Sequence, residues 1–368
     1  MRRILKWSIR AILVALVLAF LAGFVAYWRS TNECYSKTGA PAHPMKAIRY
    51  CEYGSPDVLK LEEVEKPVPK DDQVLIKVRA ASLNFIDPGL MRGPWPIRLM
   101  FGLRKPEKTR LGNDLAGQVE AVGKNVTLFK TGDEVFGVGR PTIAEYACAR
   151  ERGLVLKPPN VTFEQAGCVA WAGFTALQGL RQGHIQRGQK VLINGATGGV
   201  GTFAVQMAKS FGAEVTGVCS TGKVDLVRSI GADHVIDYTK EDFTKGDQRY
   251  DVIFDNVQNH SFSDRRRVLT PNGICVLAGI GGAGLHPEAW GRILGCFKAD
   301  LLSRFVRQKF VRYGTKLDKD DLKLLSDLMQ TGKVTPVIDR TYKLSETAEA
   351  MRYYETGSVR GKIVITME

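Results

Sequence analysis

The stretch that decides the fold is INGATGGVGTFAVQMAKSFGAEV, residues 193–215, in which four glycines separate an apolar run from a helical one. The preceding residues 190–194, KVLIN, are apolar and bounded by polar residues, as in a buried parallel strand. After the glycines, apolar residues recur at helical spacing up to Gly212, which ends the predicted helix. Residues 214–219 predict a second strand. This order of strand, glycine turn, helix and strand is typical of a dinucleotide-binding crossover.

The glycine turn has a physical use in binding a pyrophosphate. Bare backbone lets phosphate groups approach closely, and the unpaired N–H groups of the first helical turn point at their negative charge. The spacing G-x-x-G-x-x-G is complete, whereas the shorter pattern G-x-G-x-x-G has an alanine in its first position. Glycine turns also serve plain strand-to-helix connections, so the motif alone leaves both interpretations open. The residues predicted to bind the cofactor here are Gly195, Ala196, Thr197, Gly198, Gly199, Val200 and Gly201.

The charge of the chain is strongly basic and unevenly distributed. Its 368 residues carry a net charge of +14, from 52 basic and 38 acidic side chains. Half of this excess lies in residues 1–50, and a second basic stretch lies among leucines and phenylalanines in residues 285–313. No zinc-finger, RNP or basic-zipper pattern is present, so nucleic acid is not an expected partner. The distribution favours contact with a membrane, although a helix packed with its basic face in water is an alternative for the second stretch.

An uncharged run near the N-terminus predicts a membrane anchor. Residues 11–28, AILVALVLAFLAGFVAYW, are long enough to cross a bilayer and end in an aromatic pair. Basic residues precede the run, but a cleavable signal would need a shorter apolar core and a better small-x-small site. A mitochondrial presequence would be less hydrophobic and richer in serine. We therefore expect residues 1–44 to form an uncleaved single-span anchor and a polar tether.

The seven cysteines are scattered and form no C-x-x-C pair. They stand at Cys34, Cys51, Cys148, Cys168, Cys219, Cys275 and Cys296. Their odd number and spacing predict small core residues of a reducing compartment, not a disulfide framework or a metal cluster.

In the rest of the chain, the predicted secondary structure changes once, from short β-rich runs to alternating strands and helices. From Met45 onwards, short β-rich runs separated by glycine and proline predict an irregular, barrel-like domain. Residues 163–180 are helical in pattern, and strands and helices then alternate, which predicts a doubly wound parallel sheet. The predicted strands of that sheet are 190–194, 214–219, 234–237, 252–255 and 274–279, followed by a helix at 346–355 and a last strand at 362–366.

From Met45 to Glu368 the chain resembles the medium-chain dehydrogenases/reductases of the zinc-free quinone oxidoreductase type. The motifs that carry the resemblance are SLNFIDPGLMRG, LGNDLAGQVEAVG, FKTGDEVFG, AEYACA, AGFTALQGL, VLINGATGGVGTFAVQMAK, SIGADHVIDY and RGKIVI. The resemblance implies an α/β protein with a GroES-like catalytic domain at 45–165, a Rossmann NADPH-binding domain at 166–315, and a C-terminal segment at 316–368 that returns to the catalytic domain. The predicted anchor precedes them, and the resemblance also implies homodimers.

The same resemblance argues against a catalytic metal. The zinc members of the family have a cysteine in the stretch matching 82–87, a His-Glu pair at Asn113 and Asp114, and a second cysteine near 171–174. None of these positions holds a cysteine or a histidine here. Without a Lewis acid to polarise an alcohol, a quinone or activated alkene is the better hydride acceptor, because conjugation spreads the developing charge.

The end of the second predicted strand suggests NADPH as the cofactor. NAD sites usually place an acid there to hold the ribose 2′-hydroxyl, but no acid is present from Gly217 to Val224. Ser220, Thr221 and Lys223 are placed for a 2′-phosphate. In the family a lysine at this position and a tyrosine matching Tyr238 bind that phosphate, and Asn256 completes the predicted cofactor site. The alternative is a plain Ser-Thr-Gly turn followed by a solvated lysine.

The resemblance also implies the substrate-side residues. Asn84 and Asp87 match the family's N-x-x-D motif beside the nicotinamide, and Thr175 matches a residue at the nicotinamide end. From the residues alone, Asp87 before a proline is equally an N-cap, and Thr175 a packed helix residue. Two departures alter the expected site: Gly89 stands where many relatives have tyrosine or lysine, and Gln258 where relatives tend to have glycine.

These features predict a zinc-independent oxidoreductase that transfers a hydride from NADPH to a quinone or to the C=C bond of an α,β-unsaturated carbonyl. The alternative is a non-catalytic NADPH-binding sensor or partner protein at a membrane. The expected partners are a small quinone or enone, a membrane bound through the N-terminal helix, and a second copy of the chain. The charges flanking the span do not decide its orientation, but the supply of NADPH favours a catalytic domain on the cytoplasmic face.

Overall fold

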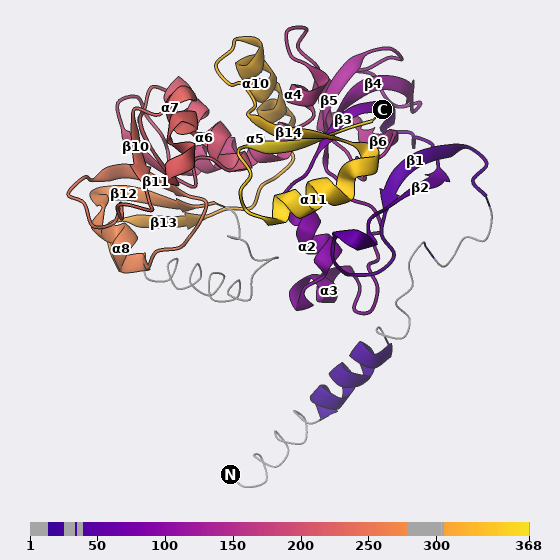
Figure 1. Ribbon diagram of the computed structural model, residues 1–368, viewed down its shortest axis with the longest axis horizontal. Coiled ribbons are helices and arrows are strands. Elements are labelled where there is room, and N and C mark those ends of the chain that lie inside the picture. The colour runs from indigo at the N-terminus through magenta and orange to yellow at the C-terminus, as the bar shows by residue number, and fades with distance from the viewer. Residues whose placement is uncertain (1–13, 26–33, 35–39, 279–302, 304, 368) are drawn as a thin grey trace.

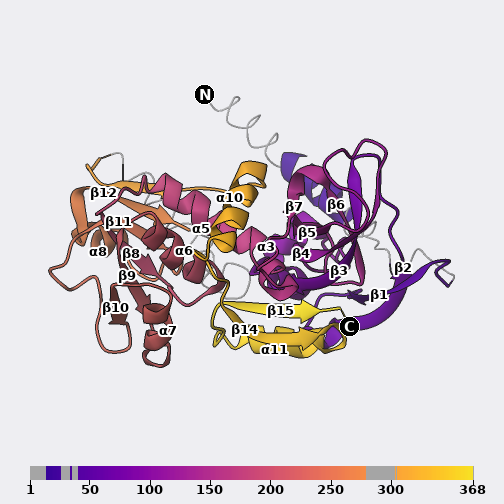
Figure 2. The ribbon, with the colours of Figure 1, turned by 90° about the horizontal axis from the view of Figure 1, so that it is seen from above.

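The computed structural model describes residues 14–25, 34, 40–278, 303 and 305–367. The described residues form two large β-sheets and one two-stranded sheet, with helices around them (Figure 1). In Figure 2 the six-stranded sheet lies on the left and the seven-stranded sheet on the right. The helices are α2 (Ile86–Arg92), α3 (Trp95–Phe101), α4 (Phe163–Ala166), α5 (Ala170–Gln182), α6 (Gly199–Ser210), α7 (Val224–Ser229), α8 (Phe262–Arg267), α10 (Lys319–Gln330) and α11 (Thr347–Glu355), with short 3₁₀ turns at Pro56–Val58, Glu151–Gly153, Thr221–Lys223 and Leu344–Glu346.

The seven-stranded sheet contains strands from the first half of the chain and from its C-terminal end. Its order is β14-β15-β3-β4-β5-β7, with β6 also paired to β3. The strands are β3 (Gln73–Ser82), β4 (Asp114–Val122), β5 (Glu134–Val138), β6 (Tyr146–Arg150), β7 (Leu154–Leu156), β14 (Ile338–Lys343) and β15 (Lys362–Thr366), and a separate pair is formed by β1 (Pro44–Arg49) and β2 (Lys60–Glu65). Because β15 pairs with β3 in antiparallel register, it lies in the same sheet as strands nearly three hundred positions earlier. Figure 1 shows this as yellow elements beside purple ones.

The core of this sheet follows from alternation along β3. Val74, Ile76 and Val78 are at most 1% exposed, whereas Lys77 between them faces outward. Full burial of an aliphatic side chain of this size contributes about 1.5–3 kcal/mol to the free energy of unfolding. The prediction of a β-rich, barrel-like region after Met45 is confirmed.

The six-stranded sheet is parallel throughout, as the alternating pattern predicts. Its order is β10-β9-β8-β11-β12-β13. The strand numbers fall from β10 to β8 and rise from β11 onwards, so the order of the strands reverses between β8 and β11 while all six run parallel. The strands are β8 (Lys190–Asn194), β9 (Glu214–Cys219), β10 (His234–Asp237), β11 (Tyr250–Asp255), β12 (Leu269–Leu277) and β13 (Lys309–Arg312). The first three have the predicted bounds, β11 begins two residues earlier, and β12 begins five residues earlier than predicted. The last predicted strand, 362–366, has the bounds of β15.

Local chemistry explains where the helices begin and end. Gly212 has a φ of +85° and follows the C-cap of α6, so it ends the helix as predicted. The single helical pattern at 163–180 forms two helices, α4 and α5. α4 begins with a capping box between Thr162 and Gln165 and stops at Gly167. The backbone N–H of Trp171, at the start of α5, donates to the Asp114 carboxylate.

The prediction of a single-span membrane protein with its catalytic domain on the cytoplasmic face is wrong. The predicted span, 11–28, runs past the described residues at both ends, and its described part is a helix over 14–25. Among the described residues, none of the helices has the length and apolar character needed to cross a membrane.

The second basic stretch, 285–313, is described only at 303 and from 305 onwards. Its last residues form β13, which pairs in parallel with β12 at the edge of the six-stranded sheet. Only residues 309–312 of the stretch are thus shown to be a strand. The remainder of the prediction lies outside the described residues.

The cysteine prediction is wrong for two of the seven residues. Cys34 and Cys51 form a disulfide, with their Cα atoms 5.8 Å apart, which is a usual separation for such a bond. Cys168, Cys219 and Cys275 are buried and form no disulfide, as predicted. Burial raises the pKa of the Cys168 thiol to about 12 and keeps it in its unreactive protonated form. Cys296 lies outside the described residues.

Removal of Arg265 tests a buried ion pair that holds the end of β11. Its Nη1 donates to Asp255 Oδ2 at 2.7 Å, and the two side chains are 6% and 0% exposed. We expect Arg265→Met to lower the free energy of unfolding by about 3–5 kcal/mol, because the Asp255 charge stays buried without its partner. Arg266→Met, on the exposed face of the same helix, is the matched control and should cost less than about 1 kcal/mol. Urea unfolding measures both, and equal losses would contradict the assignment.

Candidate functional site

The candidate cofactor site lies where β8 and β11 end side by side. This is the reversal point of the sheet, and ligands of doubly wound sheets bind at the carboxyl ends of the strands there. Asn194, the last residue of β8, donates from Nδ2 to Asp255 Oδ1 at 2.9 Å. The same carboxylate oxygen accepts the backbone N–H groups of Val257 and Gln258 at 3.2 and 2.8 Å. Asp255 therefore holds together the two loops that border the site.

The glycines of the turn have three different roles. Gly195 has a φ of +86°, a left-handed conformation that favours glycine. A Cβ on Gly201 would lie 2.0 Å from the Gly195 carbonyl oxygen, so only glycine permits α6 to pack this closely on the turn. A Cβ on Gly198, in contrast, would meet no atom closer than 3.7 Å. Gly198 therefore borders open space.

That open space suits the pyrophosphate of a dinucleotide. α6 begins at Gly199 after the N-cap Gly198, and no side chain caps it. Its first N–H groups are thus free of side-chain acceptors and face the turn, which is the usual arrangement for binding phosphate. Asn256 borders the same space, since its Nδ2 would lie 4.0 Å from a Cβ on Gly198. The residues present fit the cofactor that the sequence predicts.

The other predicted residues of the turn face the protein. Ala196 is fully buried, and its N–H donates to the Val218 carbonyl at 3.1 Å. Thr197 is 8% exposed, and its carbonyl accepts the Gly361 N–H at 2.8 Å. Val200 packs against the core beneath the sheet. These residues shape the turn, and the contact to Gly361 joins it to the C-terminal strand.

The residues predicted for a 2′-phosphate follow β9. Lys223 is half-buried and donates from Nζ to the Val359 carbonyl at 3.0 Å. Burial lowers the pKa of Lys223, and the positive charge of Arg360 lowers it further. Ser220 and Tyr238 are at least partly exposed, but the Thr221 hydroxyl donates to Asp237 at 2.6 Å. Arg360 is thus a second cation near Lys223 that the sequence analysis missed, because it comes from the far end of the chain.

Gln258 has a backbone conformation that explains the glycine preferred by relatives. Its φ is +59°, a left-handed value that costs a side chain some strain. The residue is 8% exposed, and its Nε2 donates to the Ala278 carbonyl at 3.3 Å. Its amide is thus directed to the end of β12.

On the substrate side, Asp87 stabilises the backbone from inside helix α2. The N-cap of that helix is Phe85, so the interpretation of Asp87 as an N-cap is wrong. Instead the fully buried Asp87 carboxylate accepts the N–H groups of Asn84 and Gly112 at 2.7 and 3.1 Å. Burial raises its pKa to about 6, which these two hydrogen bonds oppose.

Asn84 lies in a buried polar cluster built from four elements. Its Nδ2 donates to Asp114 Oδ2 at 3.0 Å, and its Oδ1 accepts from Lys362 Nζ at 2.7 Å. Asp114 also accepts from Ser82 Oγ at 3.0 Å and from the Trp171 N–H at 2.9 Å. Lys362 is a further residue that the sequence analysis missed. The signal was present, since a lone lysine opens the otherwise apolar strand KIVIT.

Thr175 uses its hydroxyl within the protein. Oγ1 donates to the Trp171 carbonyl at 2.9 Å and shares a hydrogen bond with Thr315 Oγ1 at 3.0 Å. The Tyr313 hydroxyl donates to the Thr175 carbonyl. These contacts connect α5 with residues 313–315.

The positions that bind zinc in other members converge here without forming a zinc site. Ser82, Asp114 and Trp171 meet around the Asp114 carboxylate, but both of its oxygens already accept hydrogen bonds. The described residues contain no group of three histidines, cysteines or acids placed to hold a metal ion. The donors present do not fit zinc, which prefers sulfur and imidazole ligands.

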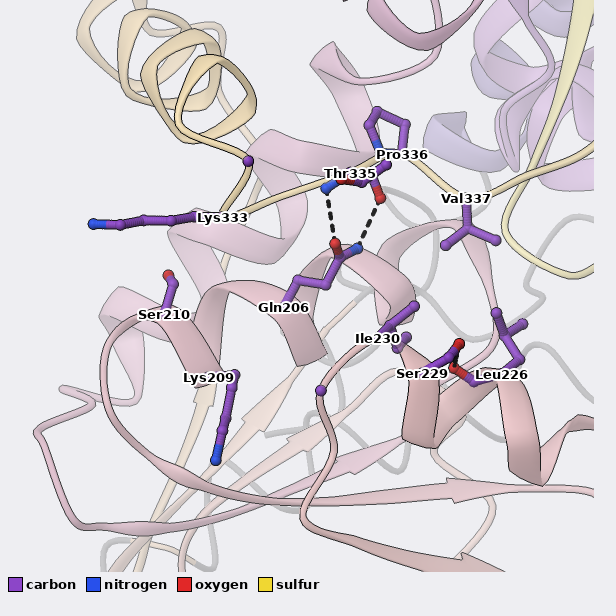
Figure 3. A pocket seen from close by; sticks show the side chains of 12 residues that line it. Gln206, Lys209, Ser210, Leu226, Ser229, Ile230, Lys333, Thr335, Pro336 and Val337 are labelled. Atoms are coloured by element: carbon purple, nitrogen blue, oxygen red, sulfur yellow. Dashed lines mark hydrogen bonds between the residues drawn. The ribbon is translucent and has the colours of Figure 1, made fainter.

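A separate cavity of about 580 Å³ lies between α6, α7 and the segment before β14. Figure 3 shows Gln206 pointing at the backbone of Thr335, with which it exchanges hydrogen bonds of 3.0 and 2.8 Å. None of the predicted site residues lines this cavity. The Gln206 amide thus connects α6 with the segment before β14.

Comparison with known families and proteins agrees with this architecture. The alcohol dehydrogenase GroES-like domain matches residues 70–160, and the zinc-binding dehydrogenase family matches residues 230–365. The 2-methylene-furan-3-one reductase of Solanum lycopersicum is 35% identical over 336 residues, covering 87% of this chain and 79% of its own length. The chloroplastic NADPH-dependent alkenal/one oxidoreductase of Arabidopsis thaliana has the same identity and coverage.

A solved structure shows the same fold. The quinone oxidoreductase from Coxiella burnetii superposes with a TM-score of 0.77 at 30% identity, covering 88% of this chain and all of that one. Identity at this level over most of the length of these proteins establishes common descent. The chain therefore belongs to the medium-chain dehydrogenase/reductase superfamily, with a GroES-like region and a Rossmann-like sheet, and it is an oxidoreductase of the quinone and enone reductase type.

Proposed function

We propose that this protein is a zinc-independent reductase that uses NADPH to reduce a quinone or the C=C bond of an α,β-unsaturated carbonyl. The observation that carries the proposal is the contact of the pair Gly361 and Lys362 with both halves of the site. The Gly361 N–H donates to Thr197 of the glycine turn, while Lys362 Nζ reaches Asn84. A polar amide is thereby held next to the dinucleotide turn. The names of the alkenal/one and furanone reductases support the substrate class.

The chemistry divides between the cofactor and the chain. When bound, NADPH supplies the hydride that reduces the acceptor. The glycine turn and the first N–H groups of α6 bind its pyrophosphate, and Lys223 with Ser220 binds its 2′-phosphate. Asn84 donates a hydrogen bond to the carbonyl oxygen of the acceptor, where negative charge develops. The described acid that contacts the Asn84 side chain is Asp114, and both of its oxygens already accept hydrogen bonds, so solvent is the proposed source of the proton.

A turnover screen of the purified full chain tests the reaction class. We expect NADPH oxidation, followed at 340 nm, with 1,4-benzoquinone, 2-alkenals or cyclic enones, and no loss of rate in EDTA. Asn84→Ala should lower kcat by about a hundredfold if its amide stabilises the developing charge. Faster NADP⁺ reduction by alcohols would contradict the proposal, and tight NADPH binding without any turnover would favour a sensor.

Two glycine variants separate cofactor binding from folding. Gly198→Val should fold, because its backbone is extended and a Cβ there meets no close neighbour, yet it fills the proposed pyrophosphate space. We expect it to melt within a few degrees of the wild type and to lose NADPH binding in a fluorescence titration. Gly201→Val is the contrasting variant and should fail to fold, since its Cβ would overlap the Gly195 carbonyl. Unchanged NADPH affinity in Gly198→Val would remove the turn from the site.

Cofactor selectivity depends on Lys223 in this proposal. Lys223→Ala should weaken NADPH binding by roughly ten- to a hundredfold, because a hydrogen bond between charged groups is lost. NADH binding should change by less than about twofold, since it has no 2′-phosphate. Lys245→Ala, an exposed lysine paired with Asp242, is the control and should change neither. Equal losses for both cofactors would give Lys223 a structural role through Val359 instead.

A further inference from the structure

The buried side chain of Lys362 connects the dinucleotide turn with Asn84. The residue is 3% exposed, and Nζ donates to the Leu83 carbonyl at 3.1 Å and to Asn84 Oδ1 at 2.7 Å. Its stem lies against the start of α6, since a Cβ on Gly199 would be 3.0 Å from Lys362 Cδ. One side chain thus touches the elements on both sides of the candidate site.

The charges around Lys362 explain how an ammonium group is tolerated there. Nζ lies 3.5 Å from Asp114 Oδ2, and the Asp114 side chain is fully buried. A buried charge is costly unless an opposite charge and hydrogen-bond acceptors compensate it. Lys362 has both, in one carboxylate, one amide oxygen and one backbone carbonyl.

The same charges determine which way the Asn84 amide faces. An ammonium group only donates hydrogen bonds and a carboxylate only accepts them, so Oδ1 must face Lys362 and Nδ2 must face Asp114. A primary amide carries two N–H groups, and one of them is used by Asp114. The other has no hydrogen-bond acceptor within the part of the chain that the structure describes.

We propose that Lys362 is a positioning residue, which holds the Asn84 amide so that its second N–H group donates to the carbonyl oxygen of the substrate. This inference rests on the proposed function. In the reaction, a hydride from the dinucleotide adds to the β-carbon, the C=C electron pair moves into the bond between the α-carbon and the carbonyl carbon, and the C=O pair moves onto the oxygen. A solvent proton then binds the α-carbon, and the C=O bond re-forms.

Loss of Lys362 would affect this donor in two ways. Without a cation at Oδ1, the amide could turn over and present its own oxygen to the substrate oxygen, which is repulsive. The ammonium group also polarises the amide by bonding to its carbonyl oxygen, and linked hydrogen bonds strengthen one another. Both effects act on the transition state more than on substrate binding, because the charge on the substrate oxygen grows as the hydride arrives.

Lys362→Met in the full chain tests the assignment, because methionine keeps the length of the side chain without the charge. We expect kcat to fall by about a hundredfold, as misplaced catalytic groups often cause, with KM for the enone within a few-fold. The NADPH dissociation constant, measured by fluorescence, should change by less than about threefold. Lys362→Arg retains charge and donors and should recover part of the rate.

Lys157→Met is the matched control. The Lys157 side chain is 6% exposed, donates to the Val161 carbonyl at 2.8 Å and pairs with Glu134 at 3.1 Å, as another buried lysine of the chain. It should lower the melting temperature without a selective loss of kcat. A loss of kcat in Lys157→Met as large as that in Lys362→Met would show a general effect of removing a buried lysine, and would overturn the proposal.

A double-mutant cycle with Asn84 distinguishes a positioning role of Lys362 from an effect on protein stability. In an Asn84→Ala background, Lys362→Met should cause no further loss of kcat, because the group it positions is absent. If Lys362→Met does not fold, the same double-mutant cycle is measured with Lys362→Arg. If the Lys362 substitution lowers kcat as much in the Asn84→Ala background as in the wild type, the assignment is overturned.

A binding assay keeps the test independent of turnover. 4-Nitrophenolate carries an oxyanion whose absorbance responds to hydrogen bonds. In the presence of NADP⁺, we expect the wild type to bind it at least about tenfold more tightly than Lys362→Met, with neutral nitrobenzene bound equally by both. Equal phenolate affinities would overturn the role of Lys362. A wild type that binds the probe selectively but reduces no quinone, alkenal or enone would instead contradict the proposed function alone.

Discussion

The fully buried carboxylate of Asp114 is the constraint around which the substrate side is assembled. A buried carboxylate must be surrounded by donors, and here the donors come from the end of β3, from Asn84, from the start of α5 and from β15. Each of these elements is therefore fixed relative to the others at one point. The loss of any one donor leaves part of a buried charge without compensation, which costs more than an ordinary hydrogen bond.

The second constraint is the route of the C-terminal chain. β15 lies between β14 and β3, so it completes a sheet whose other strands lie far earlier in the sequence. Immediately before it, Gly361 has a φ of +84° and lies against Val337, and its N–H meets the glycine turn. This geometry explains why cofactor and substrate residues from two sheets meet. Gly361 contacts the glycine turn and the adjacent Lys362 contacts the Asn84 amide, so two neighbouring residues hold both groups.

Much of the fold was predictable from the sequence, because its signals are local. The apolar runs of β8, β9 and β10 and the glycine at the end of α6 are each visible within a few residues. The resemblance to a known family supplied the arrangement of the β-rich region and the positions of Asn84 and Asp87. The role of Asp87 was less visible, since it depends on the N–H of Gly112, which is twenty-five positions away.

What could not be predicted depends on distant contacts or on context. The bond between Cys34 and Cys51 needs the path of the chain around β1, which spacing alone does not reveal. In the sequence, Lys362 and Arg360 look like ordinary surface charges. The path of the C-terminal chain brings Lys362 to Asn84 and Arg360 close to Lys223. The membrane prediction failed for a related reason. It rested on the apolar run alone, whereas none of the helices among the described residues has the length and apolar character of a membrane span.

The hydrogen bond between Lys362 and Asn84 joins residues 278 positions apart. Contacts of such separation carry a large loop-closure entropy, so we expect them to form after the local pairings within each sheet. A chain that has folded its six-stranded sheet but has not yet inserted β15 would hold a nearly complete glycine turn without the Lys362 contact to Asn84. In the proposed reaction, the dinucleotide turn would therefore exist before the amide donor is held in place.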